Sequence, residues 1–257
     1  MSTLSIDCWG EDRAFAFEPS KTALLVIDMQ RHFLEPIGVE NDPAQSSTNQ
    51  EDSVEPTSLD SSLSNVELAT QVEEEDELVD MSEIVPRVRR LLDHARKIGC
   101  HVVHTREGYQ ADLSDVSSFR RELDYVGHDG PLGRSLIRGE PGHDFVSELQ
   151  PLEHELVIDK ASFGAFFQTD LDTHLRAAGV THLILCGVTT QCCVHSTLRE
   201  AVDLGYWCLT VADCCAAAEP ALHEAALLLI VGEGHLFGWI SDLSDVEISG
   251  PAIPVAS

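Results

Sequence analysis

The sequence has few basic residues and no hydrophobic run long enough to cross a membrane. It holds 16 Lys and Arg against 44 Asp and Glu, a formal net charge of −28. Nucleic acids and anionic membranes are therefore excluded as expected partners, because both would repel the chain. Its most apolar run, residues 225–231, is far shorter than the ~18 residues of a transmembrane helix. The amino-terminal stretch MSTLSIDCWGEDRAFAF lacks the basic segment and apolar core of a secretory signal.

Regularly spaced cysteines are also missing. The eight cysteines show neither the spacing of a small disulfide scaffold nor the C-x-x-C repeats of a zinc site. This pattern favours reduced thiols in a cytoplasmic protein. With 257 residues, 43% of them hydrophobic, the chain is long enough for one sizeable core, and we predict a single domain over residues 1–257.

Lys and Arg are absent from residues 40–80, where acidic and small polar residues dominate. The acids include Glu51, Asp52, Glu55, Asp60, Glu67, the run Glu73 to Glu77, and Asp80. Such a segment buries too little apolar surface to offset the entropy lost on ordering. We therefore predict an acidic, disordered insertion, with a short amphipathic helix around residues 59–68 as the alternative. The acidic charge says more about this insertion than about a substrate.

Outside the insertion, strand-like and helix-like segments alternate. Short runs rich in β-formers predict strands at residues 22–27, 101–105, 156–158, 182–186 and 207–211. Helical patterns cover residues 83–98, 170–178, 191–204 and 221–230, and a glycine ends each of the first three. Residues 110–150 are polar and punctuated by Gly and Pro, which is typical of loops and short helices. The alternation predicts a three-layer α/β/α fold, with a mostly parallel sheet and helices on both faces.

Reactive side chains follow three of these strands. Asp28, Lys160 and Cys193 stand after the first, third and fourth predicted strands. Functional groups of open α/β sheets gather at the carboxyl ends of strands, so we expect these three to converge at one edge. A helix start and a nearby ammonium would lower the pKa of the thiol toward the reactive thiolate, and a carboxylate can take its proton. Asp159 competes with Asp28 as this carboxylate.

Each of the three also has a purely structural interpretation. Asp28 suits a turn or a helix cap, and Lys160 suits a solvated surface position. Cys193, taken alone, is typical of a small buried apolar residue. Only their combination favours a catalytic site.

Three ordered motifs around these residues resemble those of the isochorismatase-like cysteine hydrolases. They are LLVIDMQ at residues 24–30, VIDK at 157–160 and CGVTTQCCV at 186–194. The likeness covers roughly residues 20–38 and 82–240. It implies the α/β/α fold, usually assembled as a homo-oligomer. It also implies a catalytic triad of Asp28, Lys160 and Cys193, in which Cys193, and not Cys192, is the nucleophile.

The resemblance further implies how the turn before Cys193 is built. The family has a cis peptide bond there, between Val188 and Thr189 in this chain. The N–H groups of Thr189 and Cys193 would then point at the oxyanion that develops when a carbonyl is attacked.

Within this family the chain most resembles the biuret and ureide hydrolases. HTREG at residues 104–108, RGEPG at 138–142 and ADCC at 212–215 recur in them. The resemblance implies a metal-independent hydrolase of a small linear amide or ureide, biuret-like or ureidoacrylate-like, that needs no cofactor and forms a covalent acyl-enzyme on Cys193.

Four residues are candidates for substrate contacts. Phe33 and Phe163 would form apolar walls, while Arg106 and Glu233 would supply polar contacts or serve as surface ion-pair residues. Glu233 and Phe163 stand where the biuret enzyme carries a Gln and a Lys. A Glu carboxylate only accepts hydrogen bonds, so the far end of the substrate is expected to differ from biuret.

Two other reactions and one non-enzymatic role remain as alternatives. Nicotinamidases hold a metal with an Asp and histidines after the second strand. Glu107 and Tyr109 replace that Asp and one His here, so we expect no metal. An isochorismatase hydrolyses a vinyl ether to release pyruvate and needs no thiol. A chain that had lost turnover would serve as a binding protein, with the acidic insertion as its contact surface.

Overall fold

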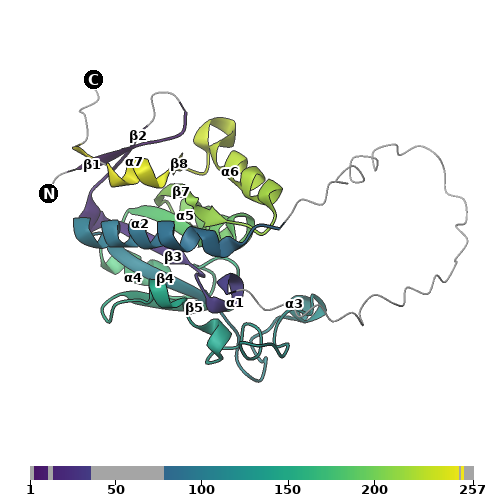
Figure 1. Ribbon diagram of the computed structural model, residues 1–257. Coiled ribbons are helices and arrows are strands. Elements are labelled where there is room, and N and C mark those ends of the chain that lie inside the picture. The colour runs from purple at the N-terminus through teal and green to yellow at the C-terminus, as the bar shows by residue number, and fades with distance from the viewer. Residues whose placement is uncertain (1–2, 11–13, 36–77, 249, 252–257) are drawn as a thin grey trace, which may run out of the picture. The chain divides into compact units, whose positions relative to one another are not determined.

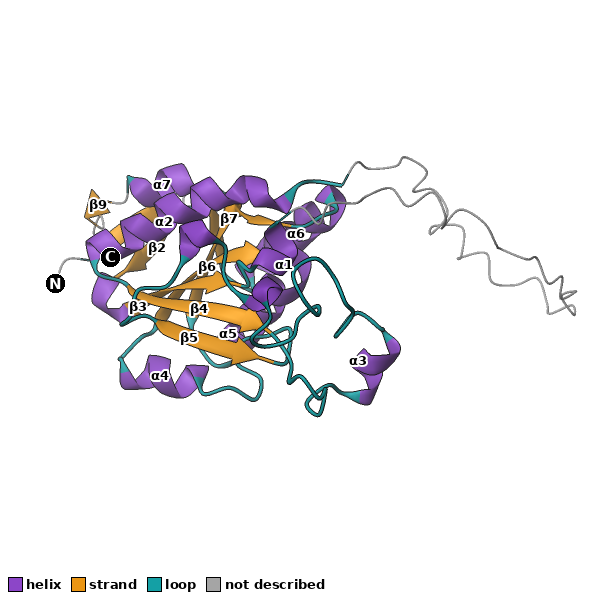
Figure 2. Ribbon diagram, turned by 60° about the horizontal axis from the view of Figure 1, so that its bottom comes forward, coloured by secondary structure: helices purple, strands orange, loops and turns teal. Residues whose placement is uncertain are grey.

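The apolar runs of the sequence form one parallel sheet (Figures 1 and 2). The computed structural model describes residues 3–10, 14–35, 78–248 and 250–251. Six strands lie in the order β5-β4-β3-β6-β7-β8. They are β3 (Thr22–Ile27), β4 (His101–Glu107), β5 (Leu156–Lys160), β6 (His182–Val188), β7 (Trp207–Ala216) and β8 (Trp239–Ser241). All neighbouring pairs are parallel, so their carboxyl ends lie along one edge.

Helices cover both faces of this sheet (Figure 2). On one face, α2 (Val85–Ile98) and α7 (Leu243–Glu247) share a core with Leu24 and Val26 of β3. On the other, α4 (Leu171–Ala177), α5 (His195–Asp203) and α6 (Pro220–His235) share a core with Leu25 and Ile27. Strand β3 is buried on both sides, which explains why its sequence is apolar throughout after Thr22. The predicted three-layer α/β fold is confirmed.

The shorter elements are mostly those that the sequence did not predict. A separate antiparallel sheet has the order β2-β1-β9. Its strands are β1 (Leu4–Asp7), β2 (Ala14–Phe17) and β9 (Gly250–Pro251). Helices α1 (Arg31–Leu34) and α3 (Ser118–Glu122) are single turns, and 3₁₀ turns occupy Pro19–Lys21, Met81–Ile84, Pro141–His143 and Ser147–Leu149. Short runs such as these carry too little periodicity to be recognised from sequence.

Most predicted boundaries agree with the structure to within a few residues. The expected stop of α2 is confirmed at Gly99, which has the left-handed φ of 84° that favours glycine. Strand β7 extends five residues beyond its expected end at Val211, which carries Cys214 and Cys215 into the sheet. Helix α6 also runs past its expected end and contains three non-helical residues, Gly232 to Gly234.

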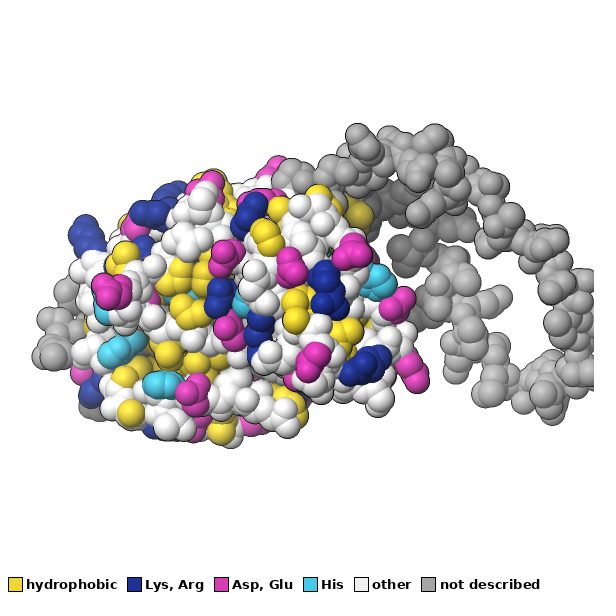
Figure 3. Space-filling view, turned by 90° about the horizontal axis from the view of Figure 1, so that it is seen from below, with side chains coloured by type: hydrophobic (Ala, Val, Ile, Leu, Met, Phe, Trp, Pro, Cys, Tyr) yellow, Lys and Arg dark blue, Asp and Glu magenta, His cyan; other side chains and the backbone are white. Residues whose placement is uncertain are grey.

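The described residues fall in one unit, formed within residues 1–35 and 78–257. The predicted acidic insertion lies outside the described residues, apart from its last three positions, which are exposed. On the face shown in Figure 3, acidic and basic side chains lie interspersed. All eight cysteines are free thiols. No helix in the described ranges has the length and apolar character needed to span a bilayer.

Candidate active site

Four buried side chains meet at the carboxyl edge of the sheet. Asp28 directly follows β3, Glu107 and Lys160 end β4 and β5, and Cys193 lies in a π-helical turn after β6. Their exposed fractions are 0%, 3%, 1% and 4%, in that order. The parallel register sets Glu107 beside Lys160. The structure thus brings together Asp28, Lys160 and Cys193, as the sequence predicted, and adds a second carboxylate.

Asp28 and Lys160 form a fully buried ion pair. Nζ of Lys160 lies 2.7 Å from Oδ2 of Asp28, and it donates to the carbonyl oxygen of Ser162 at 2.8 Å. Oδ1 of Asp28 accepts a hydrogen bond from the hydroxyl of Thr105 at 2.6 Å. Burial alone would lower the pKa of Lys160, but Asp28, with smaller contributions from Cys193 and Glu107, raises it above its ordinary value. Lys160 is therefore an ammonium, and both oxygens of Asp28 have a partner.

The turn after β6 brings the thiol to this pair. Gly187 has a φ of 118°, and a Cβ added there would lie 2.0 Å from the carbonyl oxygen of Ile27. Only glycine therefore lets β6 end so close to β3. The Val188–Thr189 peptide bond that follows is cis, as the resemblance implied. The π-helical turn Thr190–Val194 comes next and leads directly into α5.

The Cys193 thiol is protonated in this site. Its S–H donates to Oε2 of Glu107, with the sulfur 3.6 Å from the oxygen. A contact with the Cys192 thiol, burial and two neighbouring carboxylates raise the pKa of Cys193 well above its ordinary value, and only Lys160 opposes them. This direction is opposite to the lowered pKa expected from sequence, because the contact with Cys192, burial and the two carboxylates together outweigh one ammonium and a helix start. A base must take this proton before the sulfur can attack.

Arg120 and Tyr109 hold the carboxylate of Glu107 in place. Nη1 of Arg120 and the hydroxyl of Tyr109 both donate to Oε1 of Glu107, at 2.8 and 2.9 Å. The backbone N–H of Glu107 donates to the side chain of Gln30 at 2.7 Å, and the Gln30 amide donates back to the Glu107 carbonyl at 3.0 Å. Because Oε1 is occupied by these donors, Oε2 is the oxygen that meets the thiol.

Two of the four expected substrate residues lie near the side chains that hold Glu107. The Phe163 ring lies 3.9 Å from the guanidinium carbon of Arg120, so it borders the Glu107 network. Phe33, on α1, packs against the small cluster that contains Tyr109. Both aromatic rings are half-buried, which suits the predicted role as apolar walls.

The structure does not bring Arg106 to Cys193. Neighbouring strand residues point to opposite faces, so Arg106 points away from the face that carries Glu107. Its guanidinium instead pairs with Asp159 at 2.7 Å and with Asp144 at 3.3 Å. Asp159, the rival base, is thus engaged on the far face of the sheet, and Asp28 is the carboxylate that forms the ion pair with Lys160.

Glu233 is also far from the site. Helix α6 starts beside the nucleophile turn, where Thr190 hydrogen-bonds His223 at 2.8 Å. It ends near the start of β8, at the amino edge of the sheet. Glu233 is exposed in the non-helical segment at that end. The helix therefore carries it away from the nucleophile of its own chain.

One group of residues in the described part of the chain has the arrangement of a metal site. The ligand atoms of Asp28, Glu107 and Cys193 all lie within 4.8 Å of one another. Lys160 and Arg120, however, already place positive charge against the two carboxylates, at 2.7 and 2.8 Å. A metal ion would be repelled by both cations, so this set fits a metal poorly.

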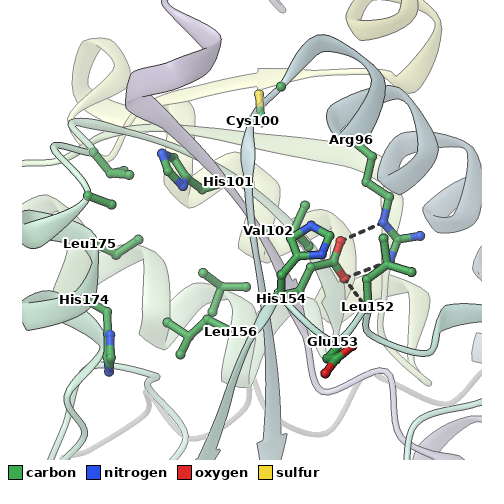
Figure 4. A pocket seen from close by; sticks show the side chains of 15 residues that line it. Arg96, Cys100, His101, Val102, Leu152, Glu153, His154, Leu156, His174 and Leu175 are labelled. Carbon is green, nitrogen blue, oxygen red and sulfur yellow. Dashed lines mark hydrogen bonds and ion pairs between the residues drawn. The ribbon is translucent and has the colours of Figure 1, made fainter.

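A cavity of about 710 Å³ lies at the opposite, amino edge of the sheet. Figure 4 shows Arg96, His101, His154 and His174 among the side chains that line it. Cys193 is not among its lining residues. Glu155 lies in its wall and pairs with Arg96 at 2.7 Å and with His104 at 3.0 Å. These contacts tie α2 and β4 to the segment before β5, so this edge has a structural role.

Glu107 and Arg120 are site residues that sequence reasoning missed. In the sequence, Glu107 stands out only as a departure from the metal-binding pattern of nicotinamidases. Strand alternation offered a signal, because it sets Glu107 on the same face of β4 as Thr105, at the end where Asp28 was expected. Arg120 lies on α3, a single helical turn within residues 110–150, where no periodic pattern predicts the direction of its side chain.

Comparison with known families gives one match that covers most of the chain. The family model for the isochorismatase domain matches residues 66–245. A ureidoacrylate amidohydrolase RutB from Serratia proteamaculans (strain 568) is 27% identical over 244 residues, which cover 90% of this chain and 83% of that protein. A ureidoacrylate amidohydrolase RutB from Acinetobacter baylyi is 30% identical over 168 residues, covering 62% and 67%.

Solved structures share the fold. A cysteine hydrolase from Pseudomonas syringae pv. phaseolicola 1448A superposes with a TM-score of 0.68 at 24% identity, covering 90% of this chain and 92% of that one. An isochorismatase family protein from Desulfovibrio vulgaris gives a TM-score of 0.65 at 26% identity, covering 88% and 96%.

Proposed function

This chain belongs to the isochorismatase family, and from that premise we propose that it is a cysteine-dependent hydrolase that cleaves the C–N bond of a small linear amide or ureide. One observation carries the proposal: the Asp28–Lys160 ion pair, 2.7 Å long, is buried at the same sheet edge as the Cys193 thiol. The names of the two RutB relatives, both ureidoacrylate amidohydrolases, support the amide and ureide class.

The first half of the proposed reaction forms an acyl-enzyme. A carboxylate oxygen of Asp28 lies within 4.8 Å of Sγ, so Asp28 takes the proton of Cys193 once the S–H turns away from Glu107. The thiolate then attacks the substrate carbonyl to form a C–S bond. The N–H groups of Thr189 and Cys193 stabilise the oxyanion; both belong to the start of a helical turn, where N–H groups lack partners within the helix. Each such donor is worth roughly 3 kcal/mol. The intermediate collapses when the C–N bond breaks, and the protonated Asp28 gives its proton to the departing amine or ammonia.

The second half releases the acid product. Asp28, again a carboxylate, takes a proton from water, whose oxygen attacks the thioester or thiocarbamate carbonyl. The C–S bond breaks, the thiolate leaves, and the proton on Asp28 returns to the sulfur. Lys160 orients Asp28 throughout and stabilises negative charge on the sulfur whenever the thiolate forms.

The test uses one purified sample and four substrates: biuret, ureidoacrylate, nicotinamide and isochorismate. We expect ammonia release from an amide or ureide and no pyruvate release from isochorismate. The Cys193→Ala variant should release no ammonia. Cys100→Ala is the matched control, because Cys100 lines the cavity at the opposite edge of the sheet. Ammonia release by Cys193→Ala at the wild-type rate would contradict the proposal.

A second measurement follows the covalent intermediate. Rapid quenching with substrate should give a protein mass increased by the acyl group. Fragment-ion sequencing should then place that group on Cys193 and leave Cys192 unmodified. An acyl group on Cys192 instead would contradict the assignment of the nucleophile.

A further inference from the structure

The charges around Cys193 form two matched pairs. Asp28 is paired with Lys160 and Glu107 with Arg120, and all four side chains are at least nine-tenths buried. With the thiol protonated, the formal charges of the site sum to zero. Among the described arginines nearby, Arg106 is committed to Asp159 and Arg138 pairs with Asp115 at 3.5 Å. The described part of the site therefore offers a substrate carboxylate no unpaired cation.

Glu107 presents one acceptor oxygen beside the nucleophile. Its Oε1 accepts from Arg120 and Tyr109, while Oε2 accepts only the S–H of Cys193. Once the thiol has lost its proton, Oε2 has no donor. A buried carboxylate oxygen without a donor is unfavourable, and a carboxylate can only accept. A substrate is therefore bound more favourably if the group next to its attacked carbon carries an N–H that can donate to Oε2.

We propose that Glu107, held by Arg120, is a specificity-determining residue that selects an uncharged, N–H-bearing group beside the carbon attacked by Cys193. An amide or ureide nitrogen there donates to Oε2 of Glu107. A carboxylate in the same place meets a second carboxylate with no free cation to receive it. This inference rests on the proposed function to the extent that Cys193 is the nucleophile.

Alkylation of Cys193 tests this selection before the substrate is known. Iodoacetamide and iodoacetate have the same shape, but one presents an uncharged amide with N–H groups and the other a carboxylate. Mass spectrometry follows the rate at which each modifies Cys193. The ratio of the two rates cancels the fraction of thiolate, which is common to both reactions. The same ratio for free N-acetylcysteine supplies the reference.

We expect the ratio at Cys193 to exceed that of N-acetylcysteine by about 10-fold or more, because the carboxylate reagent is repelled at short range. The Glu107→Gln variant should bring the ratio to within about twofold of the reference. Glu247→Gln, a matched change in an exposed ion pair with Arg90, should leave it unchanged. A wild-type ratio equal to the reference, or one unaltered in Glu107→Gln, would overturn the inference.

Loss of Glu107 alone leaves Arg120 buried without a partner and endangers folding. A Glu107→Gln, Arg120→Met double variant removes both charges and should show the same reduced ratio; a ratio kept at the wild-type value would also overturn the inference. The experiment separates the two proposals, because alkylation needs no turnover. A protein that shows the selective ratio but releases no ammonia from any amide would refute the proposed function and support the role of Glu107. Failure of both reagents to modify Cys193 would refute both.

Discussion

Lys160 and Asp28 lie 2.7 Å apart with both side chains fully buried, although they are 132 positions apart in the chain. Their pairing joins the carboxyl ends of β5 and β3 across β4. Neither charge has water to solvate it, so each depends on the other for its stability.

This dependence predicts strong coupling between the two residues. Lys160→Met and Asp28→Asn should each destabilise the fold by about 3–5 kcal/mol, because each leaves an unpaired buried charge. The double variant should lose at least about 1 kcal/mol less than the sum of the single losses. Urea denaturation of the four proteins measures this cycle. Additive losses would contradict the pairing, and every variant should lack ammonia release.

Thr105 should matter through its hydrogen bond to Asp28. Thr105→Val keeps the shape but removes the donor to Oδ1, so the carboxylate is less firmly oriented; we expect kcat to fall about 10-fold or more. Thr210→Val is a matched control on β7, because the buried Thr210 hydroxyl has no hydrogen-bond partner. That change should leave kcat unaltered and cost little or no stability. Equal kcat in Thr105→Val and wild type would contradict the role of Thr105.

Much of this arrangement could be predicted from sequence, for identifiable physical reasons. The strands before Asp28, Lys160 and Cys193 are buried on one or both faces, so their apolar runs mark where each strand ends. Parallel pairing then requires the three side chains to share an edge.

The remaining details depend on which way each side chain points, and the composition of the chain holds no information on this. Arg106 and Glu107 are adjacent, and only the face of the strand decides that Glu107 meets the thiol. Glu233 lies on a helix whose length moves it to the opposite edge. The pKa of Cys193 depends on its contact with Cys192, on burial and on two carboxylates, and no sequence motif indicates that Glu107 is one of these carboxylates.

Chelation tests the expectation that this site needs no metal. Because Lys160 and Arg120 already neutralise the two carboxylates, we expect EDTA to leave ammonia release unchanged, within about 20%. Activity is measured after dialysis against the chelator, with and without added Zn²⁺ or Mn²⁺. A complete loss that metal restores would favour the nicotinamidase alternative and refute this prediction.

Gly187 should tolerate no side chain. Gly187→Ala would push a Cβ into the Ile27 carbonyl oxygen, and the backbone of β3 cannot move without displacing Asp28. We expect a loss of about 3 kcal/mol or more, together with loss of activity. Gly139→Ala is the control, because φ is also positive there, at 88°, but nothing lies within 4 Å of the added atom. It should lose only about 1 kcal/mol and remain active. Similar losses of stability in the two variants would show that the positive φ, and not the contact of the added Cβ with β3, causes the destabilisation.

The lowered pKa of Glu155 predicts how the free energy of unfolding changes in acid. Burial would raise its pKa, but hydrogen bonds from Arg96, from the backbone of Leu152 and from His104 lower it from 4.5 to about 2. A carboxyl with a lowered pKa in the folded state stabilises the protein above its unfolded pKa, and this contribution is lost as the pH falls through the folded value. Its contribution of about 3 kcal/mol should therefore be complete near neutral pH and disappear between about pH 4.5 and pH 2.

Urea denaturation of wild type and Glu155→Gln across this pH range measures the contribution. The two free energies of unfolding should differ by about 3 kcal/mol at pH 7 and converge in acid; a difference that stays constant with pH would show that the carboxylate charge does not stabilise this edge of the sheet.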